Sequence, residues 1–119
     1  MKIDIIAGTR PNFIKIAPIV ENIERSLLIS EKLFKYRIIH TGQHYDRNMS
    51  ESFFKQLNIP TPDFNLNVGS GTQAKQTAKI MSGYENVLKE KGLPDLCIVV
   101  GDVNSTLACS IVAKRMGIK

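Results

Sequence analysis

Apolar side chains recur at two different spacings along the chain, and these spacings predict which segments are strands and which are helices. Short apolar runs are typical of strands, whereas apolar positions three and four residues apart form one stripe along a helix. The pattern predicts strands over residues 2–7, 36–41 and 95–100, with a possible short strand over 63–68. It predicts helices over residues 11–28, 46–57, 72–91 and 104–117.

The order of these elements indicates an α/β fold. Strands and helices alternate, which is the arrangement of a parallel sheet with helices on both faces. The run DLCIVV at 95–100 is apolar enough to be a strand buried on both faces. With 119 residues the chain holds one domain at most, and this length is sufficient to bury a core.

Composition narrows the class of protein further. Apolar residues make up 43% of the chain and charged residues 23%, which are ordinary values for a globular protein. No segment approaches the roughly 18–20 apolar residues that a membrane span requires, and Asp4 inside the N-terminal apolar run argues against a signal peptide. We therefore expect a cytoplasmic protein without a membrane partner, in which Cys97 and Cys109 are buried, reduced thiols.

The chain carries an excess of positive charge, with a net charge of +5 and a pI of about 9.4. Its basic residues are scattered through the predicted helices, without a dense block and with few interleaved aromatic residues. This distribution predicts a solvated surface and no nucleic-acid partner. It remains compatible with a few cations directed at an anionic small molecule.

Three of the predicted strands end in a glycine with polar neighbours. The segments are AGTRPN at 7–12, HTGQHYD at 40–46 and VVGDVNST at 99–106. Glycine permits a sharp turn and a close approach of a ligand to the backbone. Because ligands of open parallel sheets bind in the crevice at the carboxyl ends of the strands, we expect these three segments to share one site.

The first of these segments has the features of an anion site. Thr9 or Arg10 is expected near the N-cap of the following helix, with Pro11 at the first helical position, where the missing N–H costs nothing. The start of a helix offers free N–H groups and a partial positive charge, and Arg10 adds a bidentate donor. Lys15 lies one turn later and is expected to reach the same end or the adjacent solvent face. A phosphate or diphosphate is the natural ligand, and a well-made turn without a ligand is the alternative.

Asp102 stands at the end of the last predicted strand. A carboxylate in this position can act as a general acid or base, or bind a sugar hydroxyl. The alternative is that Asp102 simply caps the next helix, although Asn104, Ser105 or Thr106 could also supply that cap.

Gln43 and His44 follow the second strand. A loop histidine near a crevice could donate a hydrogen bond to a substrate or titrate near neutral pH. Hydrogen bonding within the loop is the alternative. Neither cysteine has metal-ligand spacing or partners, so no metal site is expected.

With these three segments, the sequence resembles the UDP-N-acetylglucosamine 2-epimerases of the non-hydrolysing bacterial and archaeal kind. The resemblance is carried by GTRPNFIKIAPIV at 8–20, TGQHYDRNM at 41–49 and GDVNSTLA at 101–108. Family members have a glycosyltransferase-B-like architecture, in which two Rossmann-like domains enclose the active site. The resemblance implies interconversion of UDP-GlcNAc and UDP-ManNAc for surface polysaccharide synthesis. UDP is eliminated to leave 2-acetamidoglucal and is then added back with a proton on the other face of C2, without metal or nicotinamide.

The resemblance also implies roles for particular residues. Arg10 and Lys15 match the nucleotide-sugar contacts of the family's first motif, and Asp102 matches its active-site aspartate. Gln43 and His44 match residues that in some bacterial members help to bind a second, regulatory UDP-GlcNAc. Other positions of that regulatory site differ, because Asp46 stands where a glutamine is often found and residues 69–71 offer no arginine.

Family chains are much longer, so the resemblance implies that residues 1–119 are an N-terminal Rossmann-like portion. The second domain, with further catalytic and uridine-binding residues, is absent from this sequence, and the portion alone is expected to be inactive. The full-length protein is expected to be a homodimer. The alternatives are an epimerase of a diacetamido-uronic acid, a hydrolysing UDP-GlcNAc 2-epimerase, and a non-catalytic α/β nucleotide-binding module.

Overall fold

The chain forms a four-stranded parallel sheet with the strand order β3-β2-β1-β4. The computed structural model describes residues 1–43, 52 and 54–119. The strands are β1 (Lys2–Ala7), β2 (Lys35–His40), β3 (Phe64–Asn65) and β4 (Leu96–Ile98). The parallel sheet that the alternation of elements predicts is therefore confirmed.

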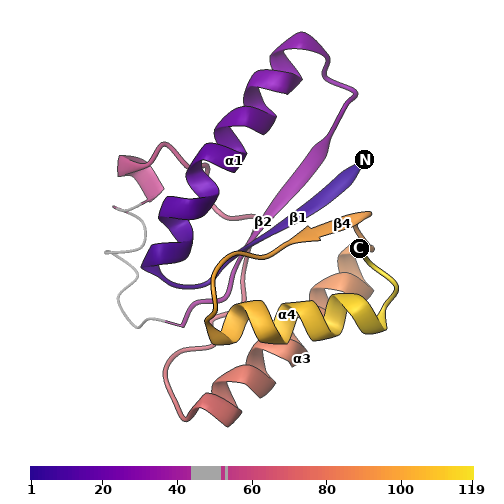
Figure 1. The fold of residues 1–119 in the computed structure, drawn as a ribbon. Helices are drawn as coiled ribbons and strands as arrows, with labels where there is room; N and C mark the ends of the chain where they lie inside the picture. Colours follow the sequence, from indigo (N-terminus) through magenta and orange to yellow (C-terminus); the bar gives the residue numbers. More distant parts are fainter. Residues whose placement is uncertain (44–51, 53) are drawn as a thin grey trace.

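Helices cover both faces of this sheet, as Figure 1 shows. On one face lies α1 (Arg10–Ile29), whose Phe13 and Ile16 pack on Ile5 and its neighbours in the sheet. On the other face lie α3 (Gln73–Lys91) and α4 (Asn104–Arg115). Their Ile80 and Ala108 belong to a second apolar cluster. Two cores, one on each face, confirm the expected Rossmann-like layering.

Most predicted boundaries lie within two residues of the observed ones. The helix expected over 46–57 falls largely outside the described residues, although residues 54–56 are helical. The last strand is shorter than expected, because β4 ends at Ile98. The carbonyl of Val100 accepts hydrogen bonds from the side chains of Asn12 and Thr106, so this part of the chain is drawn into a turn. Residues 96–100 are only half-buried, so burial on both faces was a wrong prediction.

An ion pair between a partly exposed arginine and a fully buried aspartate links β1 to β2. Asp4 on β1 lies opposite Arg37 on β2 and is fully buried. Its carboxylate accepts hydrogen bonds from Arg37 Nε (2.7 Å) and Nη2 (2.9 Å), and from the hydroxyl of Tyr84 on α3 (2.8 Å). The guanidinium also donates to the carbonyls of Lys91 and Gly92, both at 3.1 Å. These bonds tie α3 to the two central strands.

The strand order reverses its direction between β1 and β4. The chain runs from β1 outward through β2 to β3 and then returns to β4 on the other side of β1. The reversal leaves a topological switch point between the carboxyl ends of β1 and β4, which is where open α/β sheets bind their ligands. A ligand site is therefore expected at the turns that follow β1 and β4.

Candidate functional site

The β1–α1 turn is organised by the side chain of Asn12. Thr9 is the N-cap of α1, Arg10 is the first helical residue, and Pro11 is the second. The prediction that Pro11 occupies the first position was therefore wrong by one residue. Either position tolerates proline, since the first N–H groups of a helix lack an acceptor one turn earlier. The carboxamide oxygen of Asn12 accepts the N–H groups of Gly8 and Thr9, both at 3.1 Å.

These contacts correct the expectation that the start of α1 offers a set of free N–H groups. The amides of Gly8 and Thr9 are bound to Asn12, and Pro11 has no N–H. The amides of Asn12 and Phe13 both donate to the carbonyl of Thr9, at 2.9 Å and 3.3 Å. The Asn12 side chain thus satisfies N–H groups that a ligand would otherwise bind, as polar side chains commonly do at the start of a helix. Attraction for an anion therefore rests mainly on the cationic side chains of this turn.

Those cations are Arg10 and Lys15, which are both solvent-exposed. Arg10 is the first residue of α1, as expected. The Lys15 Nζ lies 3.7 Å from the position that a Cβ on Gly101 would occupy. Lys15 therefore reaches across to the β4–α4 turn, and of the two orientations expected for it, the one toward the crevice is observed.

The β4–α4 turn presents Asp102 to solvent. Gly101 adopts a φ of +82°, the left-handed conformation that favours glycine. The N-cap of α4 is Val103, which makes no side-chain cap hydrogen bond, and Asp102 lies one residue earlier. The interpretation of Asp102 as a helix cap was therefore wrong. Within the described residues the Asp102 carboxylate has no hydrogen-bond or ion-pair partner, so it is available to a ligand.

The start of α4 differs from the start of α1 in its backbone. Thr106 and Leu107 donate to the carbonyl of Val103, whereas the amides of Asn104 and Ser105 bind no acceptor among residues 1–43, 52 and 54–119. Ser105 is only 1% exposed, so its amide is shielded from solvent. The free amide of Asn104, at the positive end of the helix dipole, can donate a hydrogen bond to a ligand oxygen.

The two turns touch each other. Asn12 Nδ2 donates to the Val100 carbonyl at 3.2 Å. A Cβ on Gly8 would lie 2.1 Å from Ser105 Oγ and 2.9 Å from Gln43 Oε1, so only glycine fits where the strand exits converge. The structure thus brings Arg10, Lys15 and Asp102 to the same pair of turns at the switch point.

Gln43, after the second strand, is buried in a side-chain network. It is 6% exposed, accepts from the Thr41 hydroxyl at 3.0 Å, and donates to Gln76 Oε1 at 2.9 Å. Asn104 Nδ2 donates to the same oxygen at 2.9 Å, and Gln76 Nε2 donates to the Gly69 carbonyl at 3.0 Å. Gln43 thus links the second strand exit to the start of α4. The predicted His44 contact lies outside the described residues.

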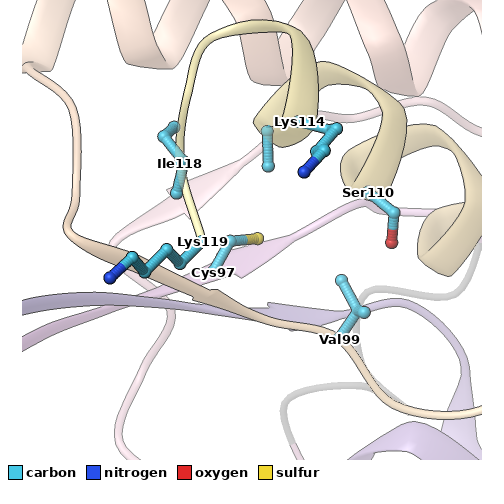
Figure 2. Close-up of a pocket in the computed structure, with 7 residues that line it drawn as sticks. Cys97, Val99, Ser110, Lys114, Ile118 and Lys119 are labelled. Atoms are coloured by element: carbon cyan, nitrogen blue, oxygen red, sulfur yellow. The ribbon is translucent and has the colours of Figure 1, made fainter.

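A pocket of about 220 Å³ lies elsewhere, beside β4. Figure 2 shows Cys97 and Val99 along one side, Ser110 and Lys114 from α4 on another, and Ile118 and Lys119 closing it. Its lining includes none of the predicted site residues that the structure describes, Arg10, Lys15, Gln43 and Asp102. The backbone of Cys97 donates to the Lys119 carbonyl at 2.7 Å, so the last residues run along the outer edge of β4.

The described part of the chain contains no group of three or more His, Cys, Asp or Glu side chains placed to hold a metal ion. No helix in these residues combines the length and apolar character needed to cross a membrane.

Comparison with known proteins places this geometry in a family. A family model described as UDP-N-acetylglucosamine 2-epimerase matches residues 27–119. The UDP-N-acetylglucosamine 2-epimerase of Methanocaldococcus jannaschii is 46% identical over 119 residues, which are 99% of this chain and 30% of that protein. The UDP-2,3-diacetamido-2,3-dideoxy-D-glucuronate 2-epimerase of Pseudomonas aeruginosa is 44% identical over 117 residues, 98% of this chain and 31% of that protein.

Solved structures agree with these sequence matches. The crystal structure of the M. jannaschii enzyme in complex with UDP-GlcNAc and UDP superposes with a TM-score of 0.87 at 46% identity, covering 100% of this chain and 31% of that one. The Neisseria meningitidis UDP-GlcNAc 2-epimerase bound to UDP-GlcNAc gives 0.85 at 28% identity, covering 99% and 30%. The chain spans about 30% of the length of these relatives. It belongs to the UDP-N-acetylglucosamine 2-epimerase family.

Proposed function

We propose that this chain is the N-terminal, Rossmann-like part of an enzyme that epimerises UDP-GlcNAc to UDP-ManNAc at C2. The observation that carries the proposal is the meeting of Arg10, Lys15 and Asp102 at the β1/β4 switch point of a chain in this family. Two cations and a carboxylate suit a substrate that has an anionic leaving group next to the carbon that exchanges its proton.

The geometry suggests a role for each residue. Arg10 and Lys15 bind the diphosphate and stabilise the charge that develops on it as the C1–O bond breaks. Asp102 either moves the C2 proton or holds a sugar hydroxyl, since its carboxylate is exposed and unpaired within the described residues. The free amide of Asn104 supplies a donor for a neutral sugar oxygen.

The remaining parts of the proposal concern the whole enzyme. A second, glycosyltransferase-B-like domain would close the crevice and complete the acid/base set, and the complete enzyme would be a homodimer. It would supply UDP-ManNAc for surface polysaccharide synthesis in the cytoplasm, where the free thiols of Cys97 and Cys109 would persist. Gln43 and His44 remain candidates for contacts to substrate or to a regulatory UDP-GlcNAc. Gln43 could serve only by exchanging its present partners, Thr41 and Gln76.

A second candidate substrate is a UDP-diacetamido-uronic acid. It is supported by the similar identity to the two relatives, 44% to the diacetamido-glucuronate epimerase and 46% to the UDP-GlcNAc epimerase. The two substrates differ at C3 and C6, and both would present the same diphosphate to Arg10 and Lys15.

A chimaeric enzyme tests the proposal. Residues 1–119 replace the matching N-terminal segment of the M. jannaschii enzyme, and UDP-GlcNAc is followed in D₂O by NMR. We expect UDP-ManNAc with deuterium at C2. Turnover of only the diacetamido substrate would favour the second candidate, and release of free ManNAc would favour the hydrolysing type. A folded chimaera that binds UDP-GlcNAc but exchanges no C2 proton would contradict the proposal.

Asp102→Asn in this chimaera is expected to lower turnover by about 10²–10⁴-fold, the usual contribution of a positioned acid or base. Asp95→Asn is the matched control, because Asp95 lies before β4 at the opposite end of the strand, where it accepts the Lys2 amide at 2.7 Å. Residues 1–119 alone are expected to be inactive, since they supply one side of the substrate site. Near wild-type turnover of Asp102→Asn would assign Asp102 no chemical role.

A further inference from the structure

We propose that Asn12 is a positioning residue that holds the β1–α1 turn against the β4–α4 turn. It thereby sets the separation of the cations Arg10 and Lys15 from the carboxylate of Asp102. The inference rests on the proposed function in one respect, because the separation matters only if these residues serve one ligand.

The contacts of Asn12 go beyond those of a helix cap. Its side chain is almost completely buried, with 2% exposure. The oxygen accepts the amides of Gly8 and Thr9, both at 3.1 Å. The nitrogen donates at 3.2 Å to the carbonyl of Val100, which lies 88 residues away in the sequence. One carboxamide therefore joins the two strand exits of the switch point.

Close packing around the Asn12 carboxamide also fixes the distance between the β1–α1 turn and the β4–α4 turn. A Cβ on Gly8 would lie 2.6 Å from Asn12 Oδ1, and a Cβ on Gly101 would lie 3.0 Å from Asn12 Nδ2. The carboxamide thus fills the gap between two glycine turns and leaves no room for them to approach. Lys15 on the same helix reaches Gly101, so a shift of α1 relative to the β4–α4 turn would move its ammonium relative to Asp102.

A cap that acts only on α1 is the competing interpretation, since a polar residue at the third helical position commonly accepts the N-cap amide. Two substitutions separate the interpretations. Asn12→Asp keeps the oxygen bound by Gly8 and Thr9 but turns a second oxygen toward the Val100 carbonyl. Asn12→Ala removes both the acceptor for the Gly8 and Thr9 amides and the donor to the Val100 carbonyl. Asn22→Ala is the matched control, because Asn22 lies on α1 and its side chain donates to the carbonyl of Pro18 in the same helix, at 2.7 Å.

The first measurement uses ¹⁵N NMR spectra and amide hydrogen exchange of the 119-residue chain without ligand. We expect the Gly8 and Thr9 amides to exchange at least about tenfold faster in Asn12→Ala, because buried donors lose their acceptor. In Asn12→Asp they should remain as protected as in the wild type. In both variants, and not in Asn22→Ala, resonances of residues 101–104 should shift and broaden. Wild-type resonances for residues 101–104 in Asn12→Asp would overturn the proposal and leave Asn12 as a cap.

The second measurement asks whether the spacing affects binding. UDP-GlcNAc is titrated into the wild type and Asn12→Ala at a temperature where circular dichroism shows both to be fully folded. We expect the dissociation constant to rise by about three- to thirtyfold, the range typical of residues that act through others. An unchanged constant in a folded variant would reduce Asn12 to a structural role. If the 119-residue wild type binds no UDP-GlcNAc, the titration is repeated with the chimaera that carries the second domain of the M. jannaschii enzyme. Absence of binding there as well would refute the proposed function, while the ligand-free spectra still decide whether Asn12 joins the turns.

Discussion

Replacement of Arg37 by methionine should be among the most destabilising single changes in this chain. The substitution keeps most of the side-chain volume but removes the guanidinium that pairs with Asp4 on the neighbouring strand. Asp4 is fully buried. Of the bonds to its carboxylate among the described residues, the one from the Tyr84 hydroxyl at 2.8 Å would remain. The carbonyls of Lys91 and Gly92 would also lose donors.

The loss of stability in Arg37→Met follows from the burial of Asp4. Removal of one partner from a buried ion pair typically costs about 3–5 kcal/mol, because the other charge remains buried without compensation. Unfolding by urea has a slope of about 1–3 kcal/mol per molar for small proteins, so the midpoint should fall by about 2 M. The loss would be a large share of the roughly 5–15 kcal/mol by which native domains are stable.

Equilibrium urea unfolding, followed by circular dichroism, is the assay, with Arg25→Met as the matched control. Arg25 pairs with Glu21 at 2.8 Å, but the two side chains are 71% and 62% exposed, so its loss should cost less than about 1 kcal/mol. Adding Asp4→Asn to Arg37→Met should restore much of the stability, because no unpaired charge is then buried. Equal losses of stability in Arg37→Met and Arg25→Met would show that the Arg37–Asp4 pair contributes no more than an exposed pair. A double variant whose loss equals the sum of the two single losses would show that Asp4 and Arg37 are not coupled.

Two further predictions concern packing and pH. Gly8→Ala should destabilise the chain by about 1–3 kcal/mol through overpacking, because the new Cβ would lie 2.1 Å from Ser105 Oγ. Gly92 has a φ of +93° and open space around it. Gly92→Ala should therefore cost only about 1–2 kcal/mol, for the left-handed backbone alone. A urea midpoint that falls further in Gly92→Ala than in Gly8→Ala would contradict overpacking at Gly8. Burial raises the pKa of the Cys109 thiol, so the folded chain retains a proton that unfolded thiols release near about pH 8.5. The contribution of Cys109 to the free energy of unfolding should therefore be fully present below that pH and be lost above it. Above that pH, the free energy of unfolding should fall less steeply with pH in Cys109→Ala than in the wild type. Equal slopes in the two proteins would exclude a contribution from Cys109.

The sequence predicted the layering of the fold because the relevant signals are local. The apolar stripe of α1 and the runs of β1 and β2 can be found within a few consecutive residues, and their alternation implies a parallel sheet. The end of β4 could not be found in this way. It depends on the bond between Val100 and Asn12, whose partners are far apart in the sequence.

The same limit applies to the candidate site. Arg10, Lys15 and Asp102 could be named because each stands next to a glycine turn or a helix start. Asn12 was missed, although a polar residue three positions after Thr9 is a recognisable capping signal. Gln76 was also missed, since nothing in a helical stretch indicates that it receives bonds from Gln43 and Asn104. Such networks follow from strand order and register, which the hydrophobic pattern leaves undetermined.

If Arg10, Lys15 and Asp102 form one nucleotide-sugar site at the switch point, titration of the ¹⁵N-labelled 119-residue chain with UDP-GlcNAc will show it. We expect saturable shifts confined to residues 8–15 and 101–105. These shifts should weaken in Arg10→Ala and Lys15→Ala but not in Lys114→Ala, a control at the pocket beside β4. Shifts centred on Lys114 and Lys119, or an unchanged spectrum at millimolar ligand, would contradict a site at the switch point.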